Sequence, residues 1–288
     1  MPGLKEIRKR ISSVKSTKQI TKAMKMVAAA KFRKAQTRII ELRPYADKMH
    51  AVLAGLAGTV EAGHPLLEVR SRRKVEVVVL TSDKGLCGAF NANIMKAAFK
   101  LIKEIKAEGP EVSVSSVGKK GTDLFRRRGI PLRQSWVGIS GRIFYGNAQE
   151  IARDIIENYT SESFDEVFLV YNEFRSALVQ KVSVARLLPL APVKEEKARE
   201  EAVDFLYEPS QQAIFEKLLP KNLEIQVFRA LLESQASEEA ARMTSMENAT
   251  KAADDMIASL TLQYNKARQA SITKELMDIV GGVEALKQ

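Results

Sequence analysis

A long C-terminal stretch of this chain contains no helix breaker. Residues Leu223–Val280 contain neither glycine nor proline, and apolar residues recur along them at helical spacing. We predict one helix of about 58 residues, roughly 85–90 Å long at 1.5 Å per residue. Globular helices usually have about 11 or 12 residues. Because no compact core can cover such a helix, it must pair along its length or run through a partner protein.

A second long helix is expected at the other end of the chain. Neither glycine nor proline occurs between Leu4 and Arg43. The first apolar residues have the alternating three- and four-residue spacing of a coiled-coil seam: Leu4, Ile7, Ile11 and Val14. The seam then shifts, as it does where a supercoil is locally rewound. We predict a helix over residues 1–60, with a kink or break at Pro44.

The segment between the two helices alternates between strand and helix patterns. The expected strands are Val75–Leu80, Val112–Val117, Val167–Tyr171 and Gln180–Leu187, and the expected helices are Asn91–Ala107, Thr122–Arg128 and Asn147–Tyr159. This order predicts a Rossmann-like βαβ domain with a parallel or mostly parallel sheet, and therefore an α/β fold. The three expected regions are residues 1–60, 74–200 and 210–288. The charged stretch Lys194–Glu201 is expected to be an exposed linker.

Charge is concentrated at one end of the chain. Residues 1–60 carry 14 Lys and Arg against three Asp and Glu, which accounts for the whole formal net charge of +11. Such a segment suits an acidic partner, either nucleic acid, anionic lipid or an acidic protein surface, although it could also be a solvated helix face. No run of about 18 apolar residues indicates a transmembrane helix. The charged start MPGLKEIRKR lacks the apolar stretch of a secretory signal. The single cysteine, Cys87, excludes an intrachain disulfide and fits a reducing compartment.

Motifs for an active site are sparse. The chain has no P-loop motif, and His50, His64 and Cys87 are too few for the common zinc sites. The turn Gly85–Gly88 stands between an expected strand and helix, where glycines can hold phosphate, but a structural turn is favoured. The basic stretch Gly118–Gly121 is expected to be a solvated loop. Cys87 is expected to fill space in the core, and the histidines to be surface or capping residues.

Five separated segments carry a resemblance to a known family. They are Ile20–Phe32 (ITKAMKMVAAAKF), extended to Ala35, then Thr81–Asn91 (TSDKGLCGAFN), Leu206–Pro209 (LYEP), Glu233–Ala249 (ESQASEEAARMTSMENA) and Tyr264–Leu276 (YNKARQASITKEL). In this order they resemble the gamma-subunit family of F-type ATP synthases, the central rotor shaft, in its bacterial type. The resemblance extends from about residue 2 to residue 286.

The resemblance implies a fold and a mechanism. The terminal helices would form a long antiparallel coiled coil inside a ring of three alpha and three beta subunits. The middle domain and the epsilon subunit would sit on the membrane rotor ring of c subunits. Proton flow would turn the ring and the shaft, whose asymmetric contacts with beta would couple ion flow to ATP synthesis and hydrolysis. The shaft itself would be non-catalytic and would hold no cofactor, nucleotide or nucleic acid. It would lie peripherally at the cytoplasmic face of the bacterial inner membrane.

The resemblance also assigns partner contacts to particular residues. Met24 would lie near the acidic lever loop of beta, and Lys25 would add a charge contact there. Arg268, Gln269 and Thr273 match positions that touch a loop of beta through hydrogen bonds. For each of these residues the alternative role is an ordinary helix-surface or packing residue.

Three further positions complete the expected contacts. Arg242 would help to couple the two terminal helices, while Tyr207 and Glu208 match the foot that meets the rotor ring. Plant chloroplast relatives carry a regulatory insertion with paired cysteines. Since Cys87 is the only cysteine, thiol switching of that type is not expected.

Two functions from other classes compete with the rotor shaft. The basic helix could bind nucleic acid, in which case affinity would fall steeply with salt concentration. The central sheet could belong to a nucleotide-binding enzyme, in which case the isolated chain would bind ATP tightly.

Overall fold

A computed structural model describes residues 3–57, 64–176, 180–190, 208 and 210–285 of the chain. The expected linker Lys194–Glu201 lies outside these residues. The chain divides into two units: residues 1–28 with 243–288, and residues 29–242. Two helices belong to both units: α1 (Leu4–Ala57, 54 residues) and α5 (Gln211–Ala285, 75 residues).

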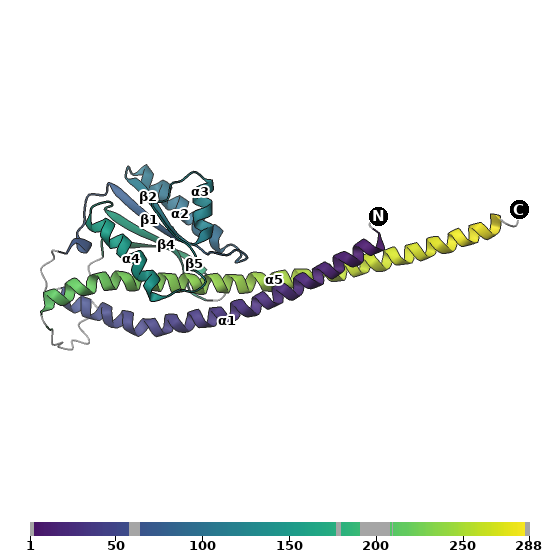
Figure 1. The fold of residues 1–288 in the computed structure, drawn as a ribbon, viewed down its shortest axis with the longest axis horizontal. Coiled ribbons are helices and arrows are strands. Elements are labelled where there is room, and N and C mark those ends of the chain that lie inside the picture. The colour runs from purple at the N-terminus through teal and green to yellow at the C-terminus, as the bar shows by residue number, and fades with distance from the viewer. Residues whose placement is uncertain (1–2, 58–63, 177–179, 191–207, 209, 286–288) are drawn as a thin grey trace. The chain divides into compact units, whose positions relative to one another are not determined.

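The first unit is an antiparallel helix pair (Figure 1). Four side-chain contacts cross the pair, and their partners advance in opposite directions along the two helices: Arg8 with Tyr264, Lys18 with Asp254, Thr21 with Thr250 and Lys25 with Glu247. The buried residues of this unit are Ile7, Thr21, Ala28, Met246 and Ala253. Three of them, one threonine and two alanines, have small side chains. Such side chains let two helices approach closely along one narrow seam.

Both long helices run through a proline. The predicted kink or break at Pro44 is not a break, because α1 continues to Ala57. Likewise α5 begins at Gln211, ahead of Pro220 and of the predicted start at Leu223. A proline inside a helix costs about 3 kcal/mol. Apolar residues on both sides of each proline are buried in one core, and their packing offsets the loss of the backbone hydrogen bond at the proline. They are Ile39 and Met49 in α1, and Phe215 and Leu223 in α5.

The second unit contains a five-stranded sheet in the order β3-β2-β1-β4-β5. Its strands are β1 (Lys74–Leu80), β2 (Glu111–Val117), β3 (Gln134–Trp136), β4 (Glu166–Phe174) and β5 (Gln180–Leu188). All neighbours are parallel except β4 and β5, which confirms the mostly parallel sheet. Strand β3 and the 3-10 turn η1 (Pro65–Leu67) were not predicted, since an element of three residues carries no periodicity.

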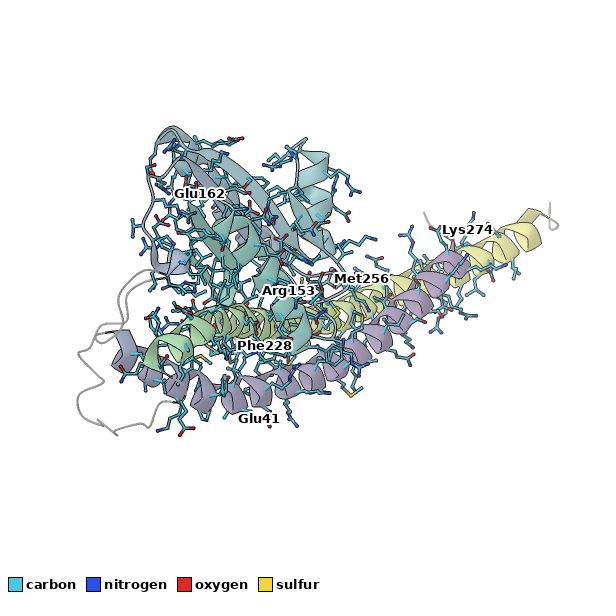
Figure 2. All side chains as sticks on the ribbon, turned by 60° about the vertical axis from the view of Figure 1, so that its left-hand side comes forward. Glu41, Arg153, Glu162, Phe228, Met256 and Lys274 are labelled. Atoms are coloured by element: carbon cyan, nitrogen blue, oxygen red, sulfur yellow. The ribbon has the colours of Figure 1, made fainter. Side chains whose placement is uncertain are left out.

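Helices cover both faces of this sheet. They are α2 (Phe90–Ala107), α3 (Lys119–Arg127) and α4 (Tyr145–Thr160), close to their predicted ranges. Side chains alternate along β1, so that Val77 and Val79 pack with α2 and α3, whereas Val78 and Leu80 pack with α4 and the long helices. Phe228 of α5, labelled in Figure 2, is one of the residues that join the layers. Its ring meets the Tyr145 ring of α4 edge-on, and the Arg38 guanidinium of α1 lies over it.

The stretch Gly118–Gly121 is not the solvated loop that its basic composition suggested. Gly118 caps the start of α3 with φ +96, and Gly121 lies in the first turn. A Cβ atom on Gly118 would stand 2.2 Å from the Thr81 carbonyl oxygen, and one on Gly121 would stand 2.7 Å from the Ser116 hydroxyl. Two glycines are therefore required for α3 to start against the end of β1.

We expect Gly118→Ala to lower the free energy of unfolding by about 3 kcal/mol, because it combines backbone strain with overpacking. Gly129→Ala is the matched control, since Gly129 also has positive φ (+67) but open space around its Cβ position. It should cost only about 1 kcal/mol. Urea denaturation followed by circular dichroism measures both. Equal losses would show that the contact with Thr81 is not tight.

Candidate functional site

The C-terminal end of α5 extends beyond the end of its partner helix, α1. The register of the helix pair places Leu4, the first residue of α1, opposite a position near residue 268. Residues 269–285 therefore lie beyond α1, as Figure 1 shows, and form about 25 Å of single helix at 1.5 Å per residue. This end carries large exposed apolar side chains: Ile272, Leu276, Met277, Ile279 and Val280. A contiguous apolar surface of this kind marks an interaction site.

Three predicted contact residues belong to this helix end. Arg268, Gln269 and Thr273 are all exposed. The 3.6-residue period of the helix puts them on one face with Ile272 and Leu276. This face can form hydrogen bonds as well as apolar contacts with a partner surface. The contacts themselves remain a prediction.

Met24 and Lys25 lie on α1, where α1 pairs with α5. Both side chains are half-buried, and Lys25 forms an ion pair with Glu247 at 3.2 Å. Close by in sequence, Ile20, Met26 and Val27 are large, apolar and about 60% exposed. This part of α1 therefore offers a partner an apolar surface, whereas Lys25 lies at the seam with α5. A direct contact of either predicted residue with a partner remains a prediction.

Part of the positive charge of the N-terminal segment is paired with carboxylates of the same chain. Ion pairs connect α1 to α5 at three lysines: Lys18 with Asp254, Lys25 with Glu247 and Lys31 with Glu239. These pairs weaken the argument for a nucleic-acid partner, since a phosphate backbone needs cations that are free to neutralise it.

Arg242 is at the centre of a buried charge cluster. Its guanidinium lies 2.5 Å from Glu238 and 2.9 Å from Glu239, and all three side chains are at most 10% exposed. It also donates a 3.4 Å hydrogen bond to the carbonyl oxygen of Gly85. Glu239 in turn lies 3.7 Å from Lys31 of α1. Arg242 thus contacts its own helix and the loop after β1. Its predicted role in coupling the long helices would run through Glu239.

Burial decides the ionisation of this cluster. Desolvation raises the pKa of Glu238 to about 7, and the nearby positive charge of Arg242 only partly opposes the rise. Removing one partner of a buried pair typically costs about 3–5 kcal/mol, because the remaining charge is left without compensation. Arg242 is therefore a structural requirement of α5.

Asp83 occupies the place where such folds bind phosphate. Nucleotides bind at the carboxyl ends of the strands in open parallel sheets, with phosphate at a helix N-terminus. Here the Asp83 carboxylate accepts hydrogen bonds from the amides of Lys119 at the start of α3, Gly138 and Ser140, and from the Ser140 hydroxyl. Burial by itself would raise the pKa of Asp83, but these hydrogen bonds outweigh it and lower the pKa. The chain thus supplies its own anion.

The space beside this carboxylate is small. A cavity of about 10 Å³ lies between the sheet edge and α5, lined by residues that include Thr81, Ser140, Gln235 and Glu238. That is room for about one water molecule and not for a nucleotide. Cys87 in the same loop is buried, and burial raises the pKa of its thiol, as expected of a core residue.

The remaining predicted positions lie elsewhere. Glu208 is exposed, while Tyr207 lies outside the described residues. His64 caps the turn η1, because its Nδ1 accepts a 3.1 Å hydrogen bond from the Leu66 amide. No helix in the described part of the chain is long and apolar enough to span a bilayer.

The roles of Asp83, Glu238 and Glu239 were not predicted from the sequence. A signal for the buried cluster was present in the sequence. Glu238, Glu239 and Arg242 stand three and four residues apart, as helical ion pairs do, within an alanine-rich stretch. No comparable signal exists for Asp83, since its hydrogen-bond donors come from segments 36 to 57 residues away.

Comparisons with known proteins agree along the whole chain. A family model described as ATP synthase matches residues 3–286. The chain is 50% identical to the ATP synthase gamma chain of Geobacter metallireducens over 289 residues, and 47% identical to that of Trichlorobacter lovleyi over 288 residues. Both matches cover all of both chains.

Solved structures share the fold. The rotor of the Euglena gracilis mitochondrial ATP synthase matches with a TM-score of 0.66 and 22% identity, covering 93% of this chain and 98% of that one. The central stalk and c-ring structure of the Tetrahymena thermophila enzyme contains a chain with 30% identity and a TM-score of 0.58, covering 80% and 99%.

We expect Asp83→Ala to lower the free energy of unfolding by about 3 kcal/mol, because charge-assisted hydrogen bonds are lost and amides are left unpaired. Asp83→Asn, which keeps one acceptor oxygen, should lose about half as much. Because the pKa of Asp83 is lowered on folding, its contribution is present above the ordinary value and is lost as pH falls through the lowered pKa. Urea midpoints measured from neutral pH to below about pH 4 should therefore converge for wild type and Asp83→Asn. A constant gap would contradict the assignment.

Proposed function

This chain belongs to the ATP synthase gamma-chain family, and we propose that it works as the central rotor shaft that couples ion flow to ATP synthesis and hydrolysis. The observation that carries the proposal is the end of α5, a single helix with an exposed apolar face that extends beyond Leu4, the first residue of its partner helix. In water such a helix would be marginal. Inside a ring of three alpha and three beta subunits it would be covered.

The proposed mechanism is that each beta subunit contacts a different face of the shaft. A shaft that presents a different face to each beta subunit stabilises a different conformation of each, and rotation exchanges these populations in turn. The antiparallel pair supplies the asymmetry, because α1 covers only one side of α5 and its first residue, Leu4, lies opposite a position near residue 268 of α5. The epsilon subunit and the c-ring would turn the shaft from the membrane side.

We assign the expected contacts as follows. Met24 and Lys25 meet the acidic lever loop of beta, which competes with Glu247 for the Lys25 ammonium group. Toward the C-terminal end of α5, Arg268, Gln269 and Thr273 contact a loop of beta.

Three further positions act away from the beta subunits. Arg242 couples α5 to α1 through Glu239 and Lys31. Tyr207 and Glu208 form the foot on the rotor ring.

The shaft itself is proposed to be non-catalytic. In its support, the Asp83 carboxylate fills the phosphate position, and the neighbouring cavity has room for about one water molecule. The chain works as a peripheral part of a membrane-associated ATP synthase. The bacterial sources of its relatives favour the cytoplasmic face of the inner membrane.

Assembly tests the proposal directly. We expect co-expression with the alpha and beta subunits of the same source to give a complex with one copy of this chain per three alpha–beta pairs, measured by size exclusion with light scattering. Deleting residues 265–288 should lower its multi-site ATPase rate, since the unpaired helix end is lost. A chain that stays apart from a competent alpha and beta pair would refute the rotor function.

Point variants test the contact face. Combined Arg268→Ala, Gln269→Ala and Thr273→Ala should lower the ATPase rate of the assembled complex roughly five- to tenfold, the range expected when about 1 kcal/mol of coupling or slightly more is lost. Lys274→Ala with Asp278→Ala is the matched control. Lys274 lies near the same end of α5 (Figure 2), and helical periodicity puts both residues on the opposite face. Equal effects of the two sets would contradict the assigned face.

A further inference from the structure

We propose that Arg8 of α1 and Tyr264 of α5 form a clamp that fixes the start of α1 on α5 and thereby positions the contact face of the unpaired helix end. The two residues lie in the first unit, residues 1–28 with 243–288. The hold on α1 concerns this chain alone, whereas the positioning of the contact face rests on the proposed rotor function.

Arg8 makes two kinds of contact with the side chain of Tyr264. Its Nη2 donates a hydrogen bond of 2.9 Å to the Tyr264 hydroxyl oxygen. The guanidinium carbon also lies 5.7 Å from the centre of the tyrosine ring. A cation at this distance is attracted to the ring, and a hydrogen bond from a charged donor is stronger than one between neutral groups. Both contacts cross from one helix to the other, so they hold α1 on α5.

Few other contacts hold this end of α1. Ile7 is the only buried side chain between Leu4 and Ile20, all of which the structure describes. The next polar contact across the pair, among the described residues, is the ion pair of Lys18 with Asp254, about 15 Å further along α1 at 1.5 Å per residue. Because helix ends open first and most easily, loss of the clamp should release the turns of α1 that precede Lys18.

The clamp lies next to the predicted contact residues. Arg268 follows Tyr264 by one helical turn and shares its face of α5. With α1 in place, this turn is the first that extends beyond Leu4. The two residue numbers of the clamp add up to 272, so Ile11 lies opposite about residue 261, and opening α1 as far as Ile11 would lengthen the unpaired helix by about 10 Å. A longer unpaired helix is held by fewer contacts, so its contact face would take a wider range of orientations.

Amide hydrogen exchange of the folded full-length chain tests the hold on α1. Tyr264→Leu removes the ring and the hydroxyl and should lower the protection of amides 8–14 about tenfold, whereas Tyr264→Phe, which keeps the ring, should lower it about threefold. Amides 21–28, which lie beyond the Lys18 ion pair, should keep their protection. A general loss of stability would lower the protection of both segments, so comparing them separates the clamp from a purely structural effect.

Arg10 provides the matched control. Arg8→Ala should lower the protection of amides 8–14 as much as Tyr264→Leu does. Arg10→Ala removes the same charge from the same part of α1, but Arg10 pairs with Glu6 of its own helix at 2.8 Å, so this protection should stay within about twofold of the wild type. Because Arg8 and Tyr264 form one interaction, the double variant Arg8→Ala with Tyr264→Leu should lose no more than Tyr264→Leu alone.

The complex with the alpha and beta subunits tests the positioning of the contact face. Tyr264→Leu should lower kcat for ATP hydrolysis per assembled complex about threefold and leave KM unchanged, because α5 does not touch nucleotide in the proposed mechanism. Tyr264→Phe should recover part of the rate. A variant that only lowers stability would reduce the yield of the complex without changing kcat.

Three results would overturn the hold on α1. They are unchanged protection of amides 8–14 in both Arg8→Ala and Tyr264→Leu, an Arg10→Ala variant that loses as much protection as Arg8→Ala, and additive losses in the double variant. A wild-type kcat in an assembled Tyr264→Leu complex would overturn the positioning of the contact face. If no complex forms with the wild-type chain, the rotor function fails, and the exchange measurements still decide whether Arg8 and Tyr264 hold α1.

Discussion

Burial of α5 between Leu223 and Arg242 holds the larger unit together. Within this stretch the helix packs its apolar side chains into the same core as β1, α4 and α1, so the sheet and the long helices share one hydrophobic interior. Polar contacts fix the helix against the sheet layers as well, since Ser237 donates to the Asn172 carbonyl of β4 and Gln235 to that of Ser140. A helix anchored in this way along about 30 Å, at 1.5 Å per residue, can transmit force as a rigid body.

The chemistry of α5 changes along its length, and that change separates anchoring from contact. Charged residues at Glu238, Glu239 and Arg242 are buried and satisfy one another, which requires accurate geometry because each unpaired charge would be costly. Near the C-terminal end the apolar side chains are exposed instead, as at Ile272 and Leu276. Helix α5 therefore combines an anchored segment with an exposed apolar end.

Sequence periodicity predicted most of the architecture, because helices and buried strands repeat their apolar residues at fixed intervals. It failed where the decisive partners are distant in sequence. Pro44 and Pro220 break a local pattern, but the core on both sides of each holds the helix together. The sequence around Gly118 and Gly121 predicts a loop, whereas in the structure both glycines pack closely against Thr81. The exposed positions Arg268, Gln269 and Thr273 were predicted as contacts from a resemblance alone, because an isolated chain contains nothing that such residues touch.

Asp83 illustrates how a fold associated with nucleotide binding can serve another purpose. Its carboxylate accepts a hydrogen bond from the Lys119 amide at the start of α3. In related sheet architectures a phosphate is held at this position. Because the same carboxylate also accepts hydrogen bonds from Gly138 and Ser140, it ties together the loops that would otherwise frame a crevice. These hydrogen bonds join the loops at this end of the sheet, and Arg242 joins the loop after β1 to the part of α5 that lies within residues 29–242.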